Sequence, residues 1–259
     1  MPVAIVNHIR NEKDMLQRLP QDLEAASDPI RRATIKNIKK FHNKHQGERC
    51  FVIGNGPSLK NTDMTKLRNE YTFGLNRIYL MFEELGFATS YFISINDLVI
   101  EQSAAEIQAL NIPKFVSWRS RKWLKPQDDL FFLYTTYTGP KFTKNAAGRL
   151  WEGATVTYAA LQLAYYFGFS EVILIGVDHS FATKGKPNTT ITSEGDDPNH
   201  FNIKYFGKGF RWQLPDLETS EIAYKMARHA FEADGRKVVD ATVGGKLTVF
   251  PKVDYGSLF

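Results

Sequence analysis

The sequence changes character at residues 49–59, which read RCFVIGNGPSL. A short apolar run, Cys50 to Ile53, leads directly into the turn sequence Gly54-Asn55-Gly56-Pro57-Ser58. A run of this length that ends in glycines is typical of a buried strand followed by a tight turn. The turn lacks the Gly-Lys-Ser/Thr ending of a Walker loop and the third glycine of a dinucleotide fingerprint. The stretch therefore predicts a strand and turn that serve neither of those two phosphate-binding motifs.

Similar apolar runs recur along the chain and alternate with helical patterns. The expected strands are 50–53, 71–75, 91–95, 114–118, 130–134, 172–175 and 237–239, and the clearest helices are 154–167 and 219–234. Strands separated by helices indicate a parallel sheet with helices on both faces. We therefore expect an α/β, Rossmann-like fold whose ligand binds beyond the carboxyl ends of the strands.

Two segments differ from this alternation. Residues 1–46 are rich in charge and helix formers, with apolar residues at helical spacing from Ile30 to Phe41, and predict an N-terminal helical arm. Residues 47–259 would form one nucleotide-binding catalytic domain. Within it, residues 181–215 carry many turn formers and then many aromatics. A connection this long is a functional lid or a disordered linker, and the aromatics favour a lid.

Composition limits the classes of function. The chain has 259 residues, is 43% hydrophobic and carries a formal net charge of +5 with scattered Lys and Arg, which suits anionic small molecules better than nucleic acid. A single Cys excludes an intramolecular disulfide and argues against a Cys-based zinc site. No apolar run suits a membrane span or a signal peptide, so we expect a cytoplasmic protein. The basic arm could still lie on acidic headgroups at the inner face of a membrane, although a solvated helix face is the simpler interpretation. Oligomeric state stays open.

Asparagines follow several expected strands and suggest a shared site. Asn55 lies in the glycine turn, Asn76 follows the second strand, and Asn96 with Asp97 follows the third. An Asn side chain offers a donor and an acceptor to a base, a ribose or a sugar hydroxyl. One such Asn is commonly only a turn residue. Three at successive strand ends predict one site at the sheet edge.

The glycine turn itself could bind a phosphate. Gly54 and Gly56 permit positive φ and close backbone approach, and Ser58 could cap a following helix with free amides. A purely structural turn would use the same residues. Similarly, Gly153, Ala154 and Thr155 stand at a helix start, where they could bind an anion or simply cap the helix.

Asp178 and His179 follow the late strand VILIG. Adjacent strand residues point to opposite sides, so only one of them would face a ligand, and the pair is weak evidence for a metal. In the expected lid, His200 could transfer a proton near neutral pH or be a surface histidine.

Basic residues alternate with aromatics later in the lid. Lys208 and Arg211, next to Trp212, could clamp a diphosphate or a carboxylate, or belong to a solvated loop.

Four motifs together resemble one family. They are GNGPSL at 54–59, EGATVTYAA at 152–160, LIGVDHSF at 174–181 and DATVGGKLTVFPKVDY at 240–255. Their order resembles the MptE-like family, named for an archaeal 6-hydroxymethylpterin pyrophosphokinase, over about residues 48–255. That family includes proteins of bacterial surface-polysaccharide and flagellin-glycosylation loci. The same skeleton is similar to the small bacterial sialyltransferases, which use a cytidine-monophosphate sugar.

The sialyltransferase likeness implies roles for single residues. Asn55 and Ser58 would hold the nucleotide phosphate, within the run Gly54, Asn55, Gly56, Pro57, Ser58. Asn76 and Asn96 would contact the nucleotide or donor. Gly153 and Thr155 would contact cytosine and donor. Asp178 matches the acidic residue that ends the late strand. His179 and Ser180 replace an aromatic pair with a phosphate-binding Tyr. His200 is the candidate for the catalytic lid histidine, while Tyr205 and Lys208 lie nearer the expected spacing.

Three functions follow from these motifs. The first is a glycosyltransferase that moves a nonulosonic acid or related sugar from a nucleotide-activated donor to a glycan acceptor in surface glycan or polysaccharide biosynthesis. A CMP-sugar is the favoured donor. His200 would be the base, and no metal would be obligatory. Amides near Gly56 and Gly153 would stabilise the departing phosphate. The second is diphosphoryl transfer from ATP to 6-hydroxymethylpterin, with Mg²⁺ on Asp97 or Asp178. The third is an inactive nucleotide-binding scaffold protein.

Overall fold

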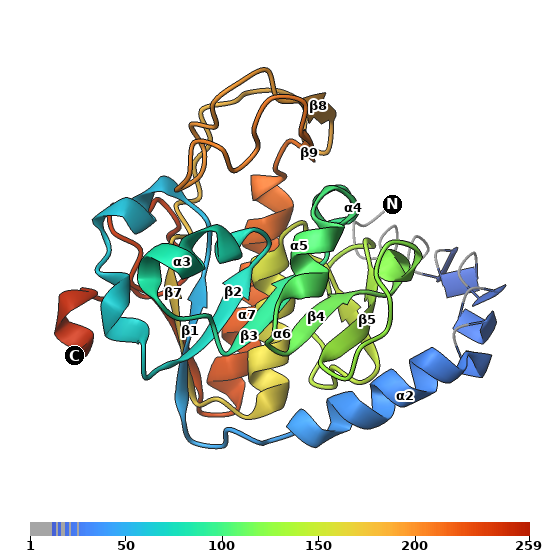
Figure 1. The fold of residues 1–259 in the computed structure, drawn as a ribbon. Helices are drawn as coiled ribbons and strands as arrows, with labels where there is room; N and C mark the ends of the chain where they lie inside the picture. The colour runs from blue at the N-terminus through green and yellow to red at the C-terminus, as the bar shows by residue number, and fades with distance from the viewer. Residues whose placement is uncertain (1–11, 14, 17–18, 21, 25) are drawn as a thin grey trace, which may run out of the picture.

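A single parallel sheet forms the centre of the fold (Figure 1). The computed structural model describes residues 12–13, 15–16, 19–20, 22–24 and 26–259. Eight strands lie in the order β10-β7-β1-β2-β3-β4-β5-β6, and each pairs with its neighbours in parallel. They are β1 (Arg49–Ile53), β2 (Tyr71–Leu75), β3 (Tyr91–Ser94), β4 (Lys114–Ser117), β5 (Leu130–Thr136), β6 (Arg149–Trp151), β7 (Glu171–Ile175) and β10 (Lys237–Asp240). The predicted Rossmann-like fold and its strands are confirmed, and of the eight strands in this sheet the prediction missed the three-residue β6.

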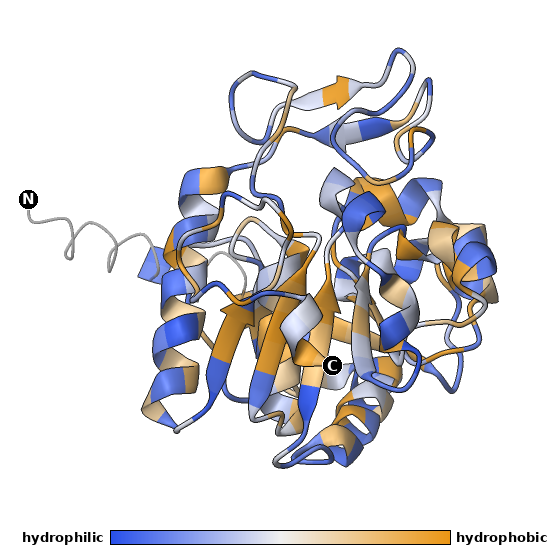
Figure 2. Cartoon of the chain, turned by 90° about the vertical axis from the view of Figure 1, so that its left-hand side faces the viewer, coloured by the Kyte–Doolittle hydropathy of each residue, from blue (hydrophilic) through white to orange (hydrophobic). Residues whose placement is uncertain are grey.

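The sheet is covered on both faces. The main helices on one face are α6 (Val156–Phe167) and α7 (Leu217–Ala233), and the other face carries α3 (Phe82–Leu85), α4 (Asp97–Gln102) and α5 (Ala104–Ala109). Alternate residues of β1 belong to different cores, Cys50 and Val52 to the first and Phe51 and Ile53 to the second. This double burial explains why β1 is a continuous apolar run rather than an alternating one. The central strands are largely hydrophobic in Figure 2.

The chain order reverses next to β1. From β1 the strands run outward through β2, β3, β4 and β5 to β6, and the chain then returns to place β7 on the other side of β1. At such a reversal the loops that leave neighbouring strands diverge above and below the sheet and leave a crevice at the carboxyl ends. The turn after β1 therefore lies at the position where an open α/β sheet binds its ligand.

Short 3₁₀ helices fill many connections. They are η1 (Lys39–Phe41), η2 (Pro57–Asn61), η3 (Met64–Leu67), η4 (Ile78–Met81), η5 (Trp118–Lys122) and η6 (Gly256–Leu258). Thus a 3₁₀ turn, not the α-helix expected at Ser58, follows the glycine turn.

The described part of the N-terminal arm packs on the sheet. Helix α2 (Pro29–Ile38) begins at Asp28, whose side chain accepts from the amides of Ile30 and Arg31. Arg31 is buried and donates to the carbonyls of Ala147 and Gly148. The ring of Phe41 stacks on Phe167 at 4.9 Å. This segment therefore contributes to the core, while the first eleven residues of the expected arm lie outside the described residues.

The predicted lid is an ordered segment above the carboxyl ends of the strands (Figure 1). It contains an antiparallel hairpin of β8 (Thr190–Thr192) and β9 (Arg211–Gln213). Its aromatics Phe201, Tyr205, Phe206 and Trp212 are buried in the second core.

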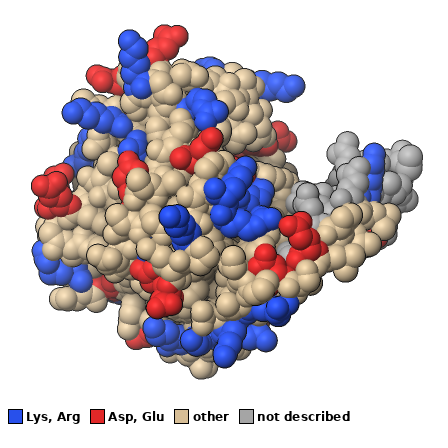
Figure 3. All heavy atoms as spheres, turned by 45° about the vertical axis from the view of Figure 1, so that its right-hand side comes forward, with Lys and Arg blue, Asp and Glu red and all other residues tan. Residues whose placement is uncertain are grey.

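Charges are mixed over the surface. Lys and Arg alternate with Asp and Glu over much of the face in Figure 3.

None of the helices in the described ranges combines the length and the apolar composition that a membrane crossing requires.

A buried histidine lies at the amino ends of the strands, opposite the cavity. His45 is 3% exposed, and its ring stacks on Phe169 at 4.6 Å. Its Nδ1 lies 2.7 Å from Glu48 Oε2, and its Nε2 lies 2.5 Å from the hydroxyl of Tyr91. A neutral ring that donates from Nδ1 and accepts at Nε2 satisfies both contacts. Burial lowers the pKa of His45 below 6.5.

This lowered pKa predicts acid lability. Between the pKa values of the folded and unfolded states the unfolded chain binds more protons, so the free energy of unfolding falls as pH drops below 6.5, by at most about 1.4 kcal/mol per pH unit for one group. Urea unfolding between pH 7.5 and 5.0 measures the slope. We expect a smaller slope in His45→Gln than in the wild type, and an unchanged slope in His42→Gln, which removes an exposed histidine. Equal slopes in wild type and His45→Gln would contradict the assignment.

Candidate functional site

A cavity of about 680 Å³ lies between the carboxyl ends of the central strands and the lid. It brings together most of the residues predicted for a site. Those that line it are Gly54, Asn55, Gly56, Asn76, Asn96, Gly153, Ala154, Thr155, Asp178, His179, His200 and Trp212. Pro57, Ser58, Asp97, Tyr205, Lys208 and Arg211 are not among its lining residues. The turns predicted to share one rim therefore do so, while the roles of the residues stay predictions.

The glycine turn is pressed against the turn after β7. The amides of Gly54 and Gly56 donate to the carbonyls of Ile175 (2.8 Å) and Gly176 (2.9 Å). A Cβ on Gly54 would lie 2.2 Å from the oxygen of Gly176. Gly56 has φ of −67°, and neither glycine of this turn has positive φ, so both are needed for close approach alone. Their amides are occupied, which removes the predicted contribution of the Gly56 amide to phosphate stabilisation.

Asp178 holds this turn in place. Its Oδ1 accepts from the Ser58 amide (3.1 Å) and its Oδ2 from the Ser58 hydroxyl (2.6 Å). A Cβ on Gly56 would lie 1.8 Å from the same carboxylate. Ser58 therefore neither caps an α-helix nor offers its hydroxyl to a phosphate, in contrast to the prediction. Asp178 was predicted to be catalytic, but its contacts position the glycine turn.

The three asparagines differ in the groups that they leave unpaired. Asn55 donates from Nδ2 to the carbonyl of Leu75 (3.0 Å), and its Oδ1 is buried without a partner. Asn76 has φ of 50°, and its Oδ1 accepts from the Ser94 hydroxyl (3.0 Å). Asn96 caps α4 through its Oδ1. Within the described ranges, the Nδ2 groups of Asn76 and Asn96 have no protein partner, so these two side chains leave donors free, whereas Asn55 Oδ1 is buried out of reach of a ligand.

The N-terminus of α6 forms another wall. Gly153 and Ala154 both have positive φ, 53° and 59°, and Thr155 caps the helix by accepting from the Thr157 amide. Among the residues that the structure describes, the amides of Gly153, Ala154 and Val156 have no hydrogen-bond partner. Free amides at the positive end of a twelve-residue helix suit an anion such as a phosphate.

His200 is paired with a carboxylate that the sequence did not reveal. Its Nδ1 lies 2.7 Å from Oδ2 of Asp197, which is 4% exposed and also accepts from the amides of Asn199 and Phe206. The ring of His200 stacks on Tyr205 at 4.0 Å and lines the cavity. An anchored carboxylate at Nδ1 fixes the tautomer in which Nε2 accepts a proton.

The other lid predictions need correction. Tyr205 is fully buried, so burial raises its pKa, and its hydroxyl accepts from the Arg77 amide (3.2 Å); it supports His200 rather than contacting a ligand. Lys208 is exposed outside the cavity. Arg211 pairs with Glu101 (2.8 Å) on α4. The basic residues therefore do not clamp a diphosphate, because they face away from the cavity or dock the lid.

His179 also lines the cavity. It has φ of 54°, and its Nε2 lies 2.9 Å from Oε1 of Glu221 on α7.

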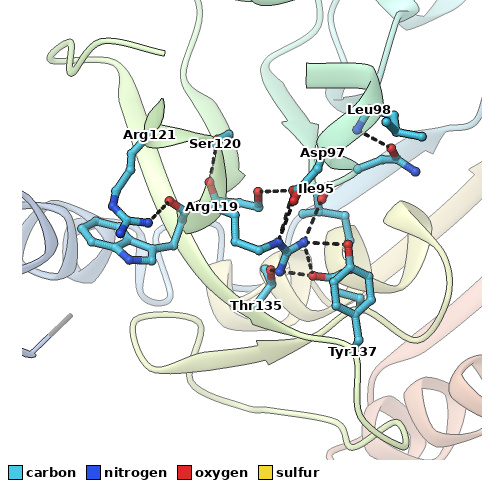
Figure 4. Close-up of polar contacts among 12 residues, drawn as sticks. Ile95, Asp97, Leu98, Arg119, Ser120, Arg121, Thr135 and Tyr137 are labelled. Atoms are coloured by element: carbon cyan, nitrogen blue, oxygen red, sulfur yellow. Dashed lines mark hydrogen bonds and ion pairs between the residues drawn. The ribbon is translucent and has the colours of Figure 1, made fainter. Parts of the chain in front are cut away.

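An arginine network lies beside the cavity (Figure 4). Arg119, on η5 after β4, contacts both oxygens of Asp97 from Nε, Thr135 from Nη1, and Tyr137 and Glu152 from Nη2. Asp97, predicted to contact the donor, is thus committed to Arg119. No motif in the sequence indicates this network, because its members lie far apart along the chain.

The predicted carboxylates do not fit a magnesium site. Within the described ranges, no group of three or more His, Cys, Asp or Glu residues is placed to hold a metal ion. Asp97 pairs with Arg119, and both oxygens of Asp178 accept from Ser58. Neither carboxylate presents the free oxygens that a Mg²⁺ ligand needs.

The close approach of the two turns predicts a severe effect of one methyl group. Gly54→Ala places a Cβ against the backbone oxygen of Gly176, and we expect destabilisation by about 1–3 kcal/mol, the usual cost of overpacking. Urea unfolding measures the change. Gly195→Ala is the control, because a Cβ there meets nothing within 4 Å and the change should leave stability equal or slightly higher. Equal stability of the two variants would show that the turns can separate without cost.

Comparisons with known proteins agree with the fold. No curated protein matches the chain. A MAf glycosyltransferase from Magnetospirillum magneticum AMB-1 is similar in structure, with a TM-score of 0.54 and 12% identity over 89% of this chain and 39% of that one. This chain therefore spans about two fifths of that protein, and the likeness shows a shared fold. A mammalian sialyltransferase in complex with Gal-beta-1-3GalNAc-ortho-nitrophenol superposes more loosely, with a TM-score of 0.39 and 11% identity over 90% of this chain and 86% of that one.

The family comparison is more specific than the structural one. The family model described as 6-hydroxymethylpterin diphosphokinase MptE-like matches residues 28–184, which is more than half of the chain. The matched region includes the glycine turn, the asparagine-bearing strand ends, the start of α6 and Asp178. We conclude that this chain belongs to the MptE-like family.

Proposed function

We propose that this protein is a transferase that uses a nucleotide-activated donor, and specifically a glycosyltransferase that passes the sugar to a glycan acceptor. The observation that carries the proposal is the combination of groups in one cavity. The Asp197–His200 pair and the free amides at the start of α6 both line it or support its lining residues. Together they supply a proton acceptor for one reactant and an anion site for the other.

His200 would act as the general base. As the acceptor hydroxyl oxygen forms its bond to the anomeric carbon, His200 Nε2 takes the hydroxyl proton, and the bond from that carbon to the phosphate oxygen breaks. The buried Asp197 carboxylate stabilises the imidazolium that forms, and its own contacts to two backbone amides hold it in place. A correctly placed base of this kind contributes about two to four decades of rate.

The leaving nucleotide would carry its phosphate to the start of α6. The amides of Gly153, Ala154 and Val156 are free and the helix dipole is favourable there. Asn76 and Asn96 line the same cavity, and their Nδ2 donors would bind further oxygens. A CMP-activated nonulosonic acid as donor, and a role in surface glycan synthesis, rest on the resemblance of the motifs to sialyltransferases.

The family name favours a second candidate. Diphosphoryl transfer from ATP to 6-hydroxymethylpterin is the activity for which the MptE-like family is named. That reaction uses Mg²⁺ to bridge the phosphates. The engagement of Asp97 by Arg119 and of Asp178 by Ser58 makes glycosyl transfer the better supported of the two.

Release of free nucleotide from CMP-, UDP- and GDP-sugars in the presence of glycan acceptors tests the proposal. With the donor that turns over, we expect His200→Ala and Asp197→Asn to lower kcat by about two to four decades, because both remove the working base. His229→Ala is the matched control, since this exposed histidine lies on the outer face of α7, away from the cavity.

Three other results would contradict it. Unchanged turnover in His200→Ala would remove the assigned base. Formation of AMP from ATP with 6-hydroxymethylpterin and Mg²⁺ would identify the diphosphokinase instead. Nucleotide binding without turnover over the full panel would favour a scaffold protein.

A further inference from the structure

A nearly buried carboxylate faces the cavity with one oxygen unused. Glu152 is 4% exposed and lines the cavity immediately before the free amides of α6. Its Oε1 accepts from Arg119 Nη2 (2.8 Å) and from the Thr135 hydroxyl (2.7 Å). Its Oε2 has no hydrogen-bond partner in the part of the chain that the structure describes. The side chain is therefore fixed by one oxygen and offers the other as an acceptor.

The groups around Glu152 disfavour a ligand that places a hydrogen-bond acceptor next to Oε2. Arg119 is the cation of this network, and its donors already contact Asp97, Thr135, Tyr137 and the carbonyl of Ile95 as well as Glu152 (Figure 4). Two carboxylates share one guanidinium, which leaves the network with net negative charge. A phosphate or carbonyl oxygen is unfavourable next to Oε2, whereas an N–H or O–H group would satisfy it.

An aromatic surface stands beside this acceptor. The centroid of the Tyr137 ring lies 4.5 Å from the guanidinium carbon of Arg119, and the Tyr137 hydroxyl accepts from Arg119 Nη2, as Figure 4 shows. Tyr137 is 59% exposed and lines the cavity. The exposed part of the ring therefore remains available to a ligand in the cavity. A flat aromatic heterocycle that stacks on such a ring would bring its edge to the neighbouring network.

From this geometry we propose that Glu152 and Tyr137 bind the base of the nucleotide and select bases with an exocyclic amino group over bases with a carbonyl oxygen at that position. The assignment rests on the proposed use of a nucleotide-activated donor. Glu152 Oε2 accepts from the amino group, as carboxylates do from N4 of cytosine. A carbonyl there places two acceptors in contact and leaves a buried carboxylate oxygen unsatisfied.

Matched nucleotide pairs test the selection directly. CMP and UMP, and AMP and IMP, differ within each pair by this amino or carbonyl group. Isothermal titration calorimetry with the wild-type protein should give tighter binding of CMP than UMP, or of AMP than IMP, by at least about tenfold, which corresponds to about 1.4 kcal/mol. Equal affinity within both pairs would overturn the assignment without any variant.

Two substitutions separate the roles of the carboxylate and the ring. Glu152→Gln keeps an oxygen for Arg119 and Thr135 but turns the open position into a donor, so the preference within a pair should fall to less than about threefold or reverse. Tyr137→Leu should weaken both members of a pair alike. Glu232→Gln, an exposed carboxylate on α7 paired with Arg228, is the control and should keep the wild-type preference. An unchanged preference in Glu152→Gln would overturn the proposal.

The outcome also distinguishes this assignment from the proposed function. If nucleotides bind without discrimination, only the assignment of Glu152 and Tyr137 fails. If none of the four nucleotides binds at millimolar concentration, the use of a nucleotide-activated donor fails as well, and the base subsite with it.

Discussion

The backbone of the turn after β1 lies directly against the backbone of the turn after β7, and the cavity takes its shape from this contact. Gly54 and Gly56 leave no space for side chains, so two neighbouring strands can end at the same level. Asp178 then fixes the turn through Ser58. Because this contact lies where the strand order reverses, everything beyond it faces an open crevice rather than packed side chains.

The walls of that crevice differ in the charge and hydrogen-bonding groups that they carry. The start of α6 carries free amides, and the Arg119 network on the neighbouring wall carries an excess of negative charge. Burial raises the pKa of Glu152, while Arg119 and Thr135 oppose this effect. A ligand with an anionic end and an uncharged, donor-bearing end matches these walls better than a uniformly charged one. A nucleotide has that polarity.

Much of the fold and part of the site could be predicted from the sequence. Parallel strands bring their carboxyl ends to one edge by necessity, so Asn55, Asn76 and Asn96 could be placed together without knowing any contact. The sequence could not separate ligand-facing side chains from supporting ones. Arg211 and Tyr205 have the residue types of a binding loop, but one docks the lid on α4 and the other is buried beneath His200.

The position of His200 depends on how the lid is docked. Phe201 donates its amide to the carbonyl of Asn55 (2.9 Å), and Arg77, at the end of β2, contacts the carbonyl of Tyr205, on which His200 stacks. These contacts hold the imidazole at the rim, so His200 keeps its position only while the lid is docked on the turns after β1 and β2. Under the proposed function, proton abstraction by His200 would require this docked lid, and a lid that excludes bulk water would suppress hydrolysis of an activated ester.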